Sequence, residues 1–201
     1  VNALFGNKLS KYDIVNCSLQ GEAAASGTAH ADNVAPAVFG GIVLIRTSDP
    51  LDVISLPVPT ALRVVVVHPH AEVLTAEARR LVAERHYTID QAVQNLGNVA
   101  ALVTALHQAD LALFARSISD ALVEPVRAPL VPGYATVRKA ALDAGALGCS
   151  ISGSGPSVVA FADSDTLAEH VATAIEDAFL SHSLTSDRYV GPVNGTGTQV
   201  V

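Results

Sequence analysis

Near the start of the chain, apolar and polar residues follow the period of an amphipathic helix. The apolar stripe passes through Val15 and Leu19, at i and i+4, and then reaches Glu22 at i+7. An acid therefore occupies a position where the pattern calls for a core-facing hydrophobic residue. We predict a helix over residues 10–26, with one carboxylate on its apolar side.

The next stretch contains two apolar runs of strand length. We predict a loop over residues 27–41, followed by short strands at 42–46 and 53–56 with a turn between them. A new pattern begins after these strands. We therefore predict a domain boundary at residues 57–60.

The longer second part of the chain opens with an apolar run at residues 62–68. Its four consecutive valines indicate a fully buried strand. Helical periodicity follows at residues 74–82, 89–106, 110–123, 134–144 and 166–180, and the third of these helices stops before Pro125. Further strands are predicted at residues 149–152, 157–162 and 188–190, the first two forming a hairpin. This order predicts an α+β sandwich close to a ferredoxin-like plan with extra helices, in domains 1–60 and 61–201.

Composition narrows the classes of protein that fit. The formal charge is −7 and the chain has three lysines without a basic cluster, which disfavours nucleic acid as a ligand. No apolar stretch reaches the length of a membrane helix, and two cysteines are too few for a disulfide framework. We therefore expect a cytoplasmic globular protein. The chain lacks methionine and starts at Val1, so we expect a processed or truncated piece of a longer protein.

The glycine-rich sequence SGSGP at residues 152–156 is the first candidate for chemistry. Small residues let backbone N–H groups approach an anion closely. The alternative is an ordinary hairpin turn, which the segment taken alone favours. It is neither a dinucleotide-binding fingerprint nor a Walker loop, because the third glycine and the lysine of those motifs are absent.

Two acids in the first part form a second candidate. Glu22 on the helix stripe, and Asp32 beside Asn33, should meet a cation, an arginine or a metal, because a buried unpaired carboxylate is costly. Magnesium typically takes one or two carboxylates together with phosphate oxygens. The alternatives, a glutamate that reaches solvent and an Asx turn, are equally compatible with the pattern.

Three residues of the second part could bind an anion. Thr75 and Arg79 stand four apart at a predicted helix start, where a hydroxyl, a guanidinium and exposed N–H groups would face one side. Arg127 lies between Pro125 and Pro129, which stiffen the chain around it. Taken alone, each position also fits an ordinary surface residue. The histidines show no metal-ligand spacing with the cysteines, so no zinc site is assigned.

Taken together, these segments resemble the homoserine kinase family of the GHMP kinase superfamily. Residues 22–41 are similar to that family's acid-to-HxDNVAP segment, and residues 74–79 to its STxxAR-like helix start. The sequence EPVR at 124–127 resembles the family's EPxR element, and residues 148–156 resemble the superfamily's SGSGP motif. The closing residues 194–200 are similar to the family's terminal strand. The resemblance therefore extends over essentially the whole chain.

This resemblance implies how the two domains are built. Residues 1–60 would be the remnant of a GHMP N-terminal, ATP-binding domain, and residues 61–201 the ferredoxin-like C-terminal domain. The family's loop around the ATP phosphates would lie upstream of Val1. We therefore expect the isolated chain to be inactive unless the missing part is supplied.

The resemblance also implies a reaction and a substrate site. The reaction would transfer the γ-phosphoryl group of ATP to the side-chain hydroxyl of L-homoserine, giving O-phospho-L-homoserine in threonine biosynthesis. Asp32 would bind the substrate ammonium group, and Asn33 would orient the attacking hydroxyl. Arg79 and Arg127 would bind the substrate carboxylate.

Further residues are implied for the phosphate and the metal. Glu22 would bind Mg²⁺, and Thr75 would sit near the transferred phosphoryl group. Gly153, Ser154 and Gly155 would support the ATP phosphate loop. A homodimer is left open by the resemblance.

Two alternatives remain at this point. One is a non-catalytic, amino-acid-binding regulatory module, which would explain a missing ATP loop. The other is a sister GHMP kinase that acts on another small alcohol. A pocket built on Asp32 would discriminate against mevalonate-type substrates, because these lack an ammonium group.

Overall fold

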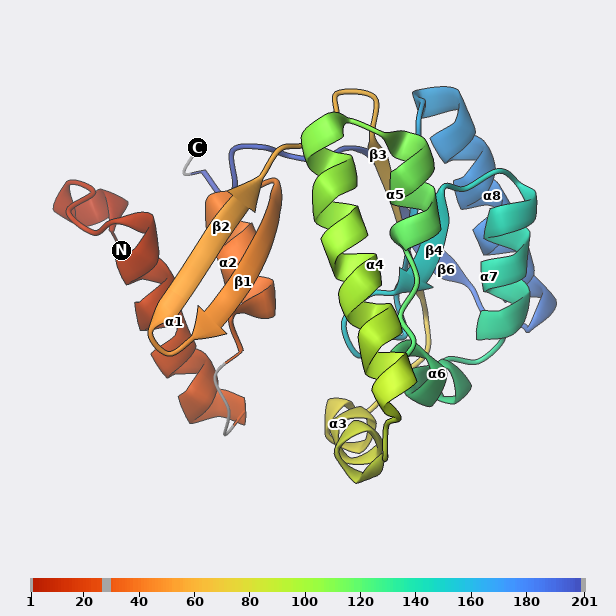
Figure 1. Ribbon diagram of the computed structural model, residues 1–201, viewed down its shortest axis with the longest axis horizontal. Helices are drawn as coiled ribbons and strands as arrows, with labels where there is room; N and C mark the ends of the chain where they lie inside the picture. Colours follow the sequence, from red (N-terminus) through yellow and green to blue (C-terminus); the bar gives the residue numbers. More distant parts are fainter. Residues whose placement is uncertain (1, 27–29, 200–201) are drawn as a thin grey trace. The chain divides into compact units, whose positions relative to one another are not determined.

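Two compact units make up the computed structural model, which describes residues 2–26 and 30–199 of the chain. The first unit combines the described parts of residues 1–58 and 193–201, and the second is Pro59–Pro192. The predicted boundary at 57–60 falls where the chain passes from one unit to the other. Figure 1 shows the elements of both units.

Helices and a β-hairpin build the first unit. Its elements are η1 Ala3–Phe5, α1 Lys11–Ser26, α2 Ala31–Phe39, β1 Ile42–Ser48 and β2 Leu51–Leu56, and the two strands pair antiparallel. On α1, Val15 and Leu19 are buried with Ala31 and Ala35 of α2 and Val53 of β2. The predicted helix and both strands are therefore confirmed.

The loop predicted for residues 27–41 is wrong over most of its described part, because α2 occupies Ala31–Phe39. Pro36 lies inside this helix, where its missing N–H removes one hydrogen bond. Ala31 and Ala35, four residues apart, are almost completely buried in the core that α2 shares with α1. This burial offsets the cost of the proline, whereas residues 27–29 lie outside the described part.

The closing segment of the chain, residues 193–199, lies against the end of α2. Both the backbone N–H and the hydroxyl of Thr198 donate to the Ala37 carbonyl, at 2.8 and 2.9 Å. Gly40 has a φ of +76°, and a Cβ atom there would overlap the backbone of Gly197. The two chain segments therefore cross at a glycine on each side.

Two sequence expectations differ from this arrangement. Residues 193–199 carry no strand, because their hydrogen bonds go to the end of a helix instead of a neighbouring strand; Val200 lies outside the described part. The same residues belong to the first unit, although the predicted division assigned all of 61–201 to the second domain.

A four-stranded antiparallel sheet forms the centre of the second unit. Its strands are β3 Arg63–Pro69, β4 Gly148–Ile151, β5 Val158–Ala162 and β6 Ser186–Pro192, in the spatial order β4-β5-β3-β6. The helices are α3 Thr75–Glu84, α4 Ile89–Gln108, α5 Leu111–Ser117, α6 Glu124–Arg127, η2 Ala128–Leu130, α7 Tyr134–Asp143 and α8 Asp165–Ser181. The ferredoxin-like plan with extra helices is confirmed, and the extra helices lie between β3 and β4.

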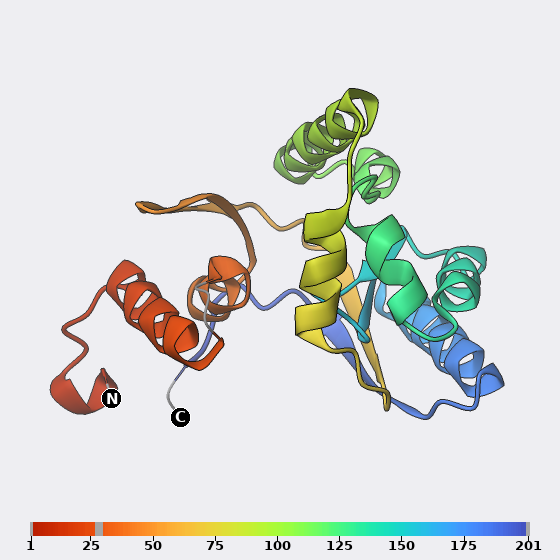
Figure 2. The same cartoon turned by 90° about the horizontal axis from the view of Figure 1, so that it is seen from below.

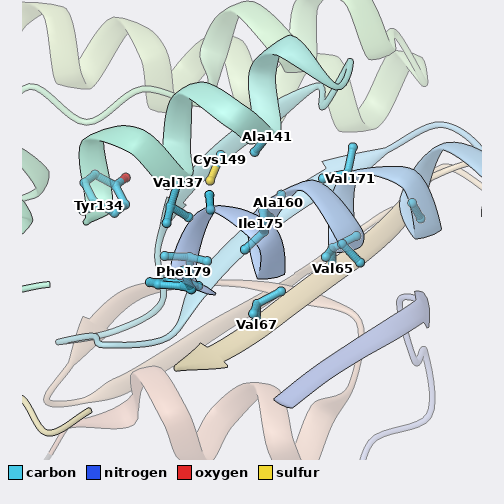
Figure 3. Packing of buried hydrophobic residues seen from close by; sticks show 14 of the residues in the cluster. Val65, Val67, Tyr134, Val137, Ala141, Cys149, Ala160, Val171, Ile175 and Phe179 are labelled. Carbon is cyan, nitrogen blue, oxygen red and sulfur yellow. The ribbon is translucent and has the colours of Figure 1, made fainter. Parts of the chain in front are cut away.

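The main core lies on the face of this sheet that α7 and α8 cover. Val65 and Val67 of β3 are fully buried there with Ile175 and Phe179 of α8, as Figure 3 shows. On β3 the burial alternates, so the prediction of a fully buried strand is wrong. The opposite face is covered less completely; Phe114 of α5 contacts β5 there, and the helices α4 and α5 are seen apart from α7 and α8 in Figure 2.

The prediction of a single helix over residues 110–123 is also wrong. Helix α5 ends at Ser117, and a turn leads into the short helix α6, in which Pro125 occupies the first turn. The Asp120 carboxylate accepts hydrogen bonds from the N–H groups of Leu122, Val123 and Glu124. Because a first-turn proline loses no helical hydrogen bond, Pro125 fits the first turn of α6 and does not end the preceding helix.

The glycine crossing in the first unit predicts a stability difference between two substitutions. We expect Gly40→Ala to lower the free energy of unfolding by roughly 2 kcal/mol or more, because it adds a strained positive φ and a backbone overlap. Gly21→Ala is the control. Gly21 lies within α1 with open space around it, so its substitution should stabilise the unit by roughly 0.5–1 kcal/mol.

Urea unfolding of the 201-residue chain, followed by circular dichroism, would measure both effects. Equal stability of the Gly40→Ala variant and the unsubstituted chain would contradict the close approach of the two segments.

Candidate functional site

The hairpin loop at residues 152–156 has a conformation that glycine makes accessible. It is closed by hydrogen bonds from the Ser152 N–H to the Ser157 carbonyl, at 2.8 Å, and from the Gly155 N–H to the Ser152 carbonyl, at 3.0 Å. Gly155 has a φ of +83°, and a Cβ atom there would lie 2.8 Å from a methyl group of Val131. At Gly153, with a φ of +60°, no atom lies within 4 Å of such a Cβ. The loop is therefore packed against protein at one glycine and open at the other.

Arg127, the last residue of α6, contacts the loop at Gly153, the glycine with open space around it. Its Nη1 atom donates to the carbonyl oxygen of Gly153 at 2.8 Å. Its Nε atom is buried and has no hydrogen-bond partner among the described residues. One end of the guanidinium is thus anchored, and the group retains donor capacity for an anion.

The start of α3 lies on another side of the same loop. Thr75 is the first residue of α3, and its hydroxyl oxygen lies 3.3 Å from the hydroxyl oxygen of Ser154. The preceding residue Leu74 supplies no side-chain cap. Arg79 follows one turn later on α3 and is half-buried. Three segments far apart in the sequence therefore meet around the loop, with a hydroxyl pair, a guanidinium and the positive end of a helix.

Glu124, the first residue of α6, is an acid that the sequence reasoning treated only as part of a motif. The Glu124 side chain is 13% exposed, its Oε2 atom accepts a hydrogen bond from Ser150, and its Oε1 atom forms an ion pair with Arg138. Burial, followed by the charge of Glu124, raises the pKa of the neighbouring Tyr134 phenol above its ordinary value. No helix was predicted from the sequence at Glu124, and an acid in the first turn of a helix is commonly explained by its favourable interaction with the helix N-terminus.

The remaining candidate residues belong to the first unit. Glu22 is half-buried in the second half of α1, whereas Asp32 and Asn33 are exposed in the first turn of α2. Helices α1 and α2 pack together, so these residues lie on neighbouring elements. The single pocket for Asp32, Arg79 and Arg127 stays a prediction, because these residues are divided between the two units.

Metal binding was also predicted from the first unit. In the part of the chain that the structure describes, no group of three histidine, cysteine or acidic residues is arranged to hold a metal ion. A single carboxylate still fits a magnesium ion that takes most of its ligands from phosphate and water. Glu22 as a magnesium ligand stays a prediction. Among the described residues, no helix combines the length and apolarity needed to span a bilayer.

Known proteins match the chain along its length. The family model "GHMP kinases C terminal" matches residues 102–181. The homoserine kinases of Chlorobium phaeobacteroides and Chlorobium phaeovibrioides are 46% and 47% identical over 202 residues, covering all of this chain. The crystal structure of homoserine kinase from Cytophaga hutchinsonii covers the whole chain at 48% identity, with a TM-score of 0.96. The chain spans 63% of the length of each of these three relatives.

The different surroundings of the two loop glycines predict different costs of substitution. We expect Gly155→Ala to lower the free energy of unfolding by about 1–3 kcal/mol more than Gly153→Ala, because only its methyl group meets Val131. Combining Gly155→Ala with Val131→Ala should recover part of that excess, which a double-mutant cycle from urea unfolding would measure. Additive costs would show that the methyl group does not meet Val131.

Proposed function

We propose that the protein takes part in the ATP-dependent phosphorylation of L-homoserine, because the chain is similar to homoserine kinases along its whole length and contains a match to the family model of the GHMP kinase C-terminal domain. The observation that carries the proposal is the similarity to homoserine kinases over all 201 residues, in sequence and in fold. The product would be O-phospho-L-homoserine. The site in the second unit offers donor groups for the anionic parts of the two reactants.

The substrate is a zwitterion, so its two charges require partners of opposite sign. Arg127 offers a guanidinium that is anchored on Gly153 and keeps a buried Nε donor. We assign the substrate carboxylate to Arg127 and Arg79, and its ammonium group to Asp32. This division would exclude alcohols that lack an ammonium group, because Asp32 would then remain without its partner.

The phosphate groups need N–H donors, hydroxyls and a metal ion. The start of α3, with Thr75, combines a helix N-terminus and a hydroxyl that faces Ser154. We assign the transferred phosphoryl group to Thr75, and the support of the ATP phosphates to Gly153, Ser154 and Gly155. Glu22 would hold Mg²⁺, which neutralises charge on the ATP phosphates when it is bound.

The attacking group is the substrate hydroxyl, and its orientation decides the rate. Phosphoryl transfer depends mainly on positioning and on charge neutralisation, so a dedicated base is not required. We assign the orientation of this hydroxyl to the Asn33 amide. Thr75 would act on the other reactant, so these two residues form the catalytic pair of the proposal.

Homoserine phosphorylation can be tested in a chimera, in which this chain replaces the matching part of a homoserine kinase. We expect a chimera of the Cytophaga hutchinsonii homoserine kinase, in which this chain replaces the matching 63%, to phosphorylate homoserine and to rescue a threonine-requiring strain that lacks homoserine kinase. Mevalonate should react at least about a hundredfold more slowly, because it offers Asp32 no ammonium group.

The same chimera with Asn33→Ala serves as the inactive control. A folded chimera that phosphorylates another small alcohol in preference to homoserine would contradict the proposal. Homoserine binding without phosphoryl transfer would favour an amino-acid-binding module.

Two neighbouring arginines on α3 provide a matched test of the carboxylate site. In the chimera, we expect Arg79→Ala or Arg127→Ala to raise KM for homoserine about ten- to a hundredfold, because a charge-assisted hydrogen bond is worth roughly 1.5–3 kcal/mol. The exposed Arg80, which pairs with Glu84, is the control, and Arg80→Ala should leave KM unchanged. Steady-state kinetics with both substrates would show whether KM for ATP stays constant, as the assignment requires.

A further inference from the structure

Three elements of the second unit meet at the carboxylate of Glu124. Its Oε2 atom accepts a hydrogen bond of 2.7 Å from the Ser150 hydroxyl on β4. Its Oε1 atom lies 3.2 Å from Nε of Arg138 on α7. Since Glu124 opens α6, one side chain links this helix to the sheet and to a second helix.

Helix α6 needs such links, because it is only four residues long. A single turn has no stability of its own in water, so tertiary contacts must fix its orientation. The Asp120 carboxylate caps its N-terminus from the preceding turn. This cap holds α6 to its own local segment, whereas the Glu124 contacts reach elements distant in the sequence.

The orientation of α6 determines where its other charged residue points. Arg127 follows Glu124 by three residues, and its guanidinium donates to Gly153 at the tip of the 152–156 loop. Ser150 is part of β4, the strand that leads directly into this loop. Glu124 and Arg127 therefore tie the same short helix to both ends of one stretch of chain, at Ser150 and at Gly153.

We propose that Glu124 is a positioning residue, which fixes α6 on Ser150 and Arg138 and thereby holds Arg127 and the 152–156 loop in the geometry that binds substrate. The substrate part of this proposal rests on the proposed function, in which Arg127 binds the homoserine carboxylate. The effect on the loop does not depend on the identity of the substrate.

The hydrogen bond between Ser150 and Glu124 lies in largely buried surroundings, whereas Arg138 is partly exposed and contributes an ion pair. Burial raises the pKa of the Cys149 thiol, next to Ser150 on β4, to about 12, and Tyr134 on α7 is also buried. Figure 3 shows Tyr134 at the start of α7 and Cys149 next to that helix. In such weakly polar surroundings a charge-assisted hydrogen bond is stronger than at the surface, and a misplaced carboxylate is more costly. Glu124 thus favours the arrangement of α6 in which its carboxylate reaches Ser150.

A purely stabilising ion pair is the competing explanation. It predicts that loss of Glu124 lowers stability without a selective effect on the loop or on one substrate. The positioning role predicts two further signs: exposure of the loop amides, and non-additivity with Arg127. Both are measurable in variants that remain folded.

Hydrogen exchange in the 201-residue chain tests the loop directly. We expect Glu124→Ala to increase exchange of the Ser152 and Gly155 amides at least about tenfold, while amides of β5 stay protected. Glu124→Gln keeps an acceptor for Ser150 and should show a smaller increase, which covers the case in which the alanine variant does not fold. Glu169→Ala, at an exposed acid paired with Arg188, is the control and should change neither amide.

Kinetics in the chimera test the connection to Arg127. We expect Glu124→Ala to raise KM for homoserine at least about fivefold with little change for ATP, and to add less than about twofold when Arg127 is already alanine. Unchanged loop exchange in folded Glu124 variants would overturn the proposal whatever the substrate is. Additive effects on KM would overturn the link to Arg127. A failure of the proposed function would instead appear as absent homoserine phosphorylation with the exchange effect intact.

Discussion

Antiparallel pairing of β3 with β5 and β6 is the constraint on which the second unit depends. Because β3 lies between these strands, its alternating side chains decide which face the helices cover. Val65 and Val67 bury one face under α7 and α8, and this burial fixes β5 and hence the hairpin to β4. The loop at residues 152–156 is therefore attached to the most deeply packed part of the unit. A rigid support suits the role proposed for this loop beside the ATP phosphates, since its glycines supply no rigidity themselves.

One polar group of the site lowers the stability of the folded chain. The buried Nε atom of Arg127 has no partner among the described residues, and an unsatisfied buried donor costs roughly 1–3 kcal/mol. Such a cost is expected where a ligand supplies the missing acceptor, because binding then removes it. The Gly153 carbonyl keeps the guanidinium from turning toward other acceptors. The proposed carboxylate of homoserine would therefore meet a group that is already oriented.

Local patterns predicted most elements but not the contacts that determine their ends. Helical periodicity located α1, α4, α7 and α8, and the apolar runs located all six strands, because these signals are local. The errors at α2 and α6 both concern short helices that contain a proline. A loop was predicted where buried alanines stabilise α2, and a helix was predicted to stop before Pro125, where an aspartate cap allows α6 to begin. Motif resemblance named the candidate residues, and the structure brings together Thr75, Arg127 and the SGSGP loop. No sequence pattern could reveal the role of Glu124, whose contacts depend on the packing of three elements.

The two charges of α6 show why the residue types in EPVR are hard to exchange. Glu124 and Arg127 are one turn apart, yet one contacts the interior and the other contacts the loop. Since a lysine has one donor group at the end of a flexible stem, it could not bind the Gly153 carbonyl and also present a second oriented donor, as the planar guanidinium does. An aspartate at position 124 would shorten the reach to Ser150 and Arg138 by one methylene group. The motif therefore combines two roles: Glu124 fixes the orientation of α6, and this orientation places the Arg127 guanidinium against Gly153.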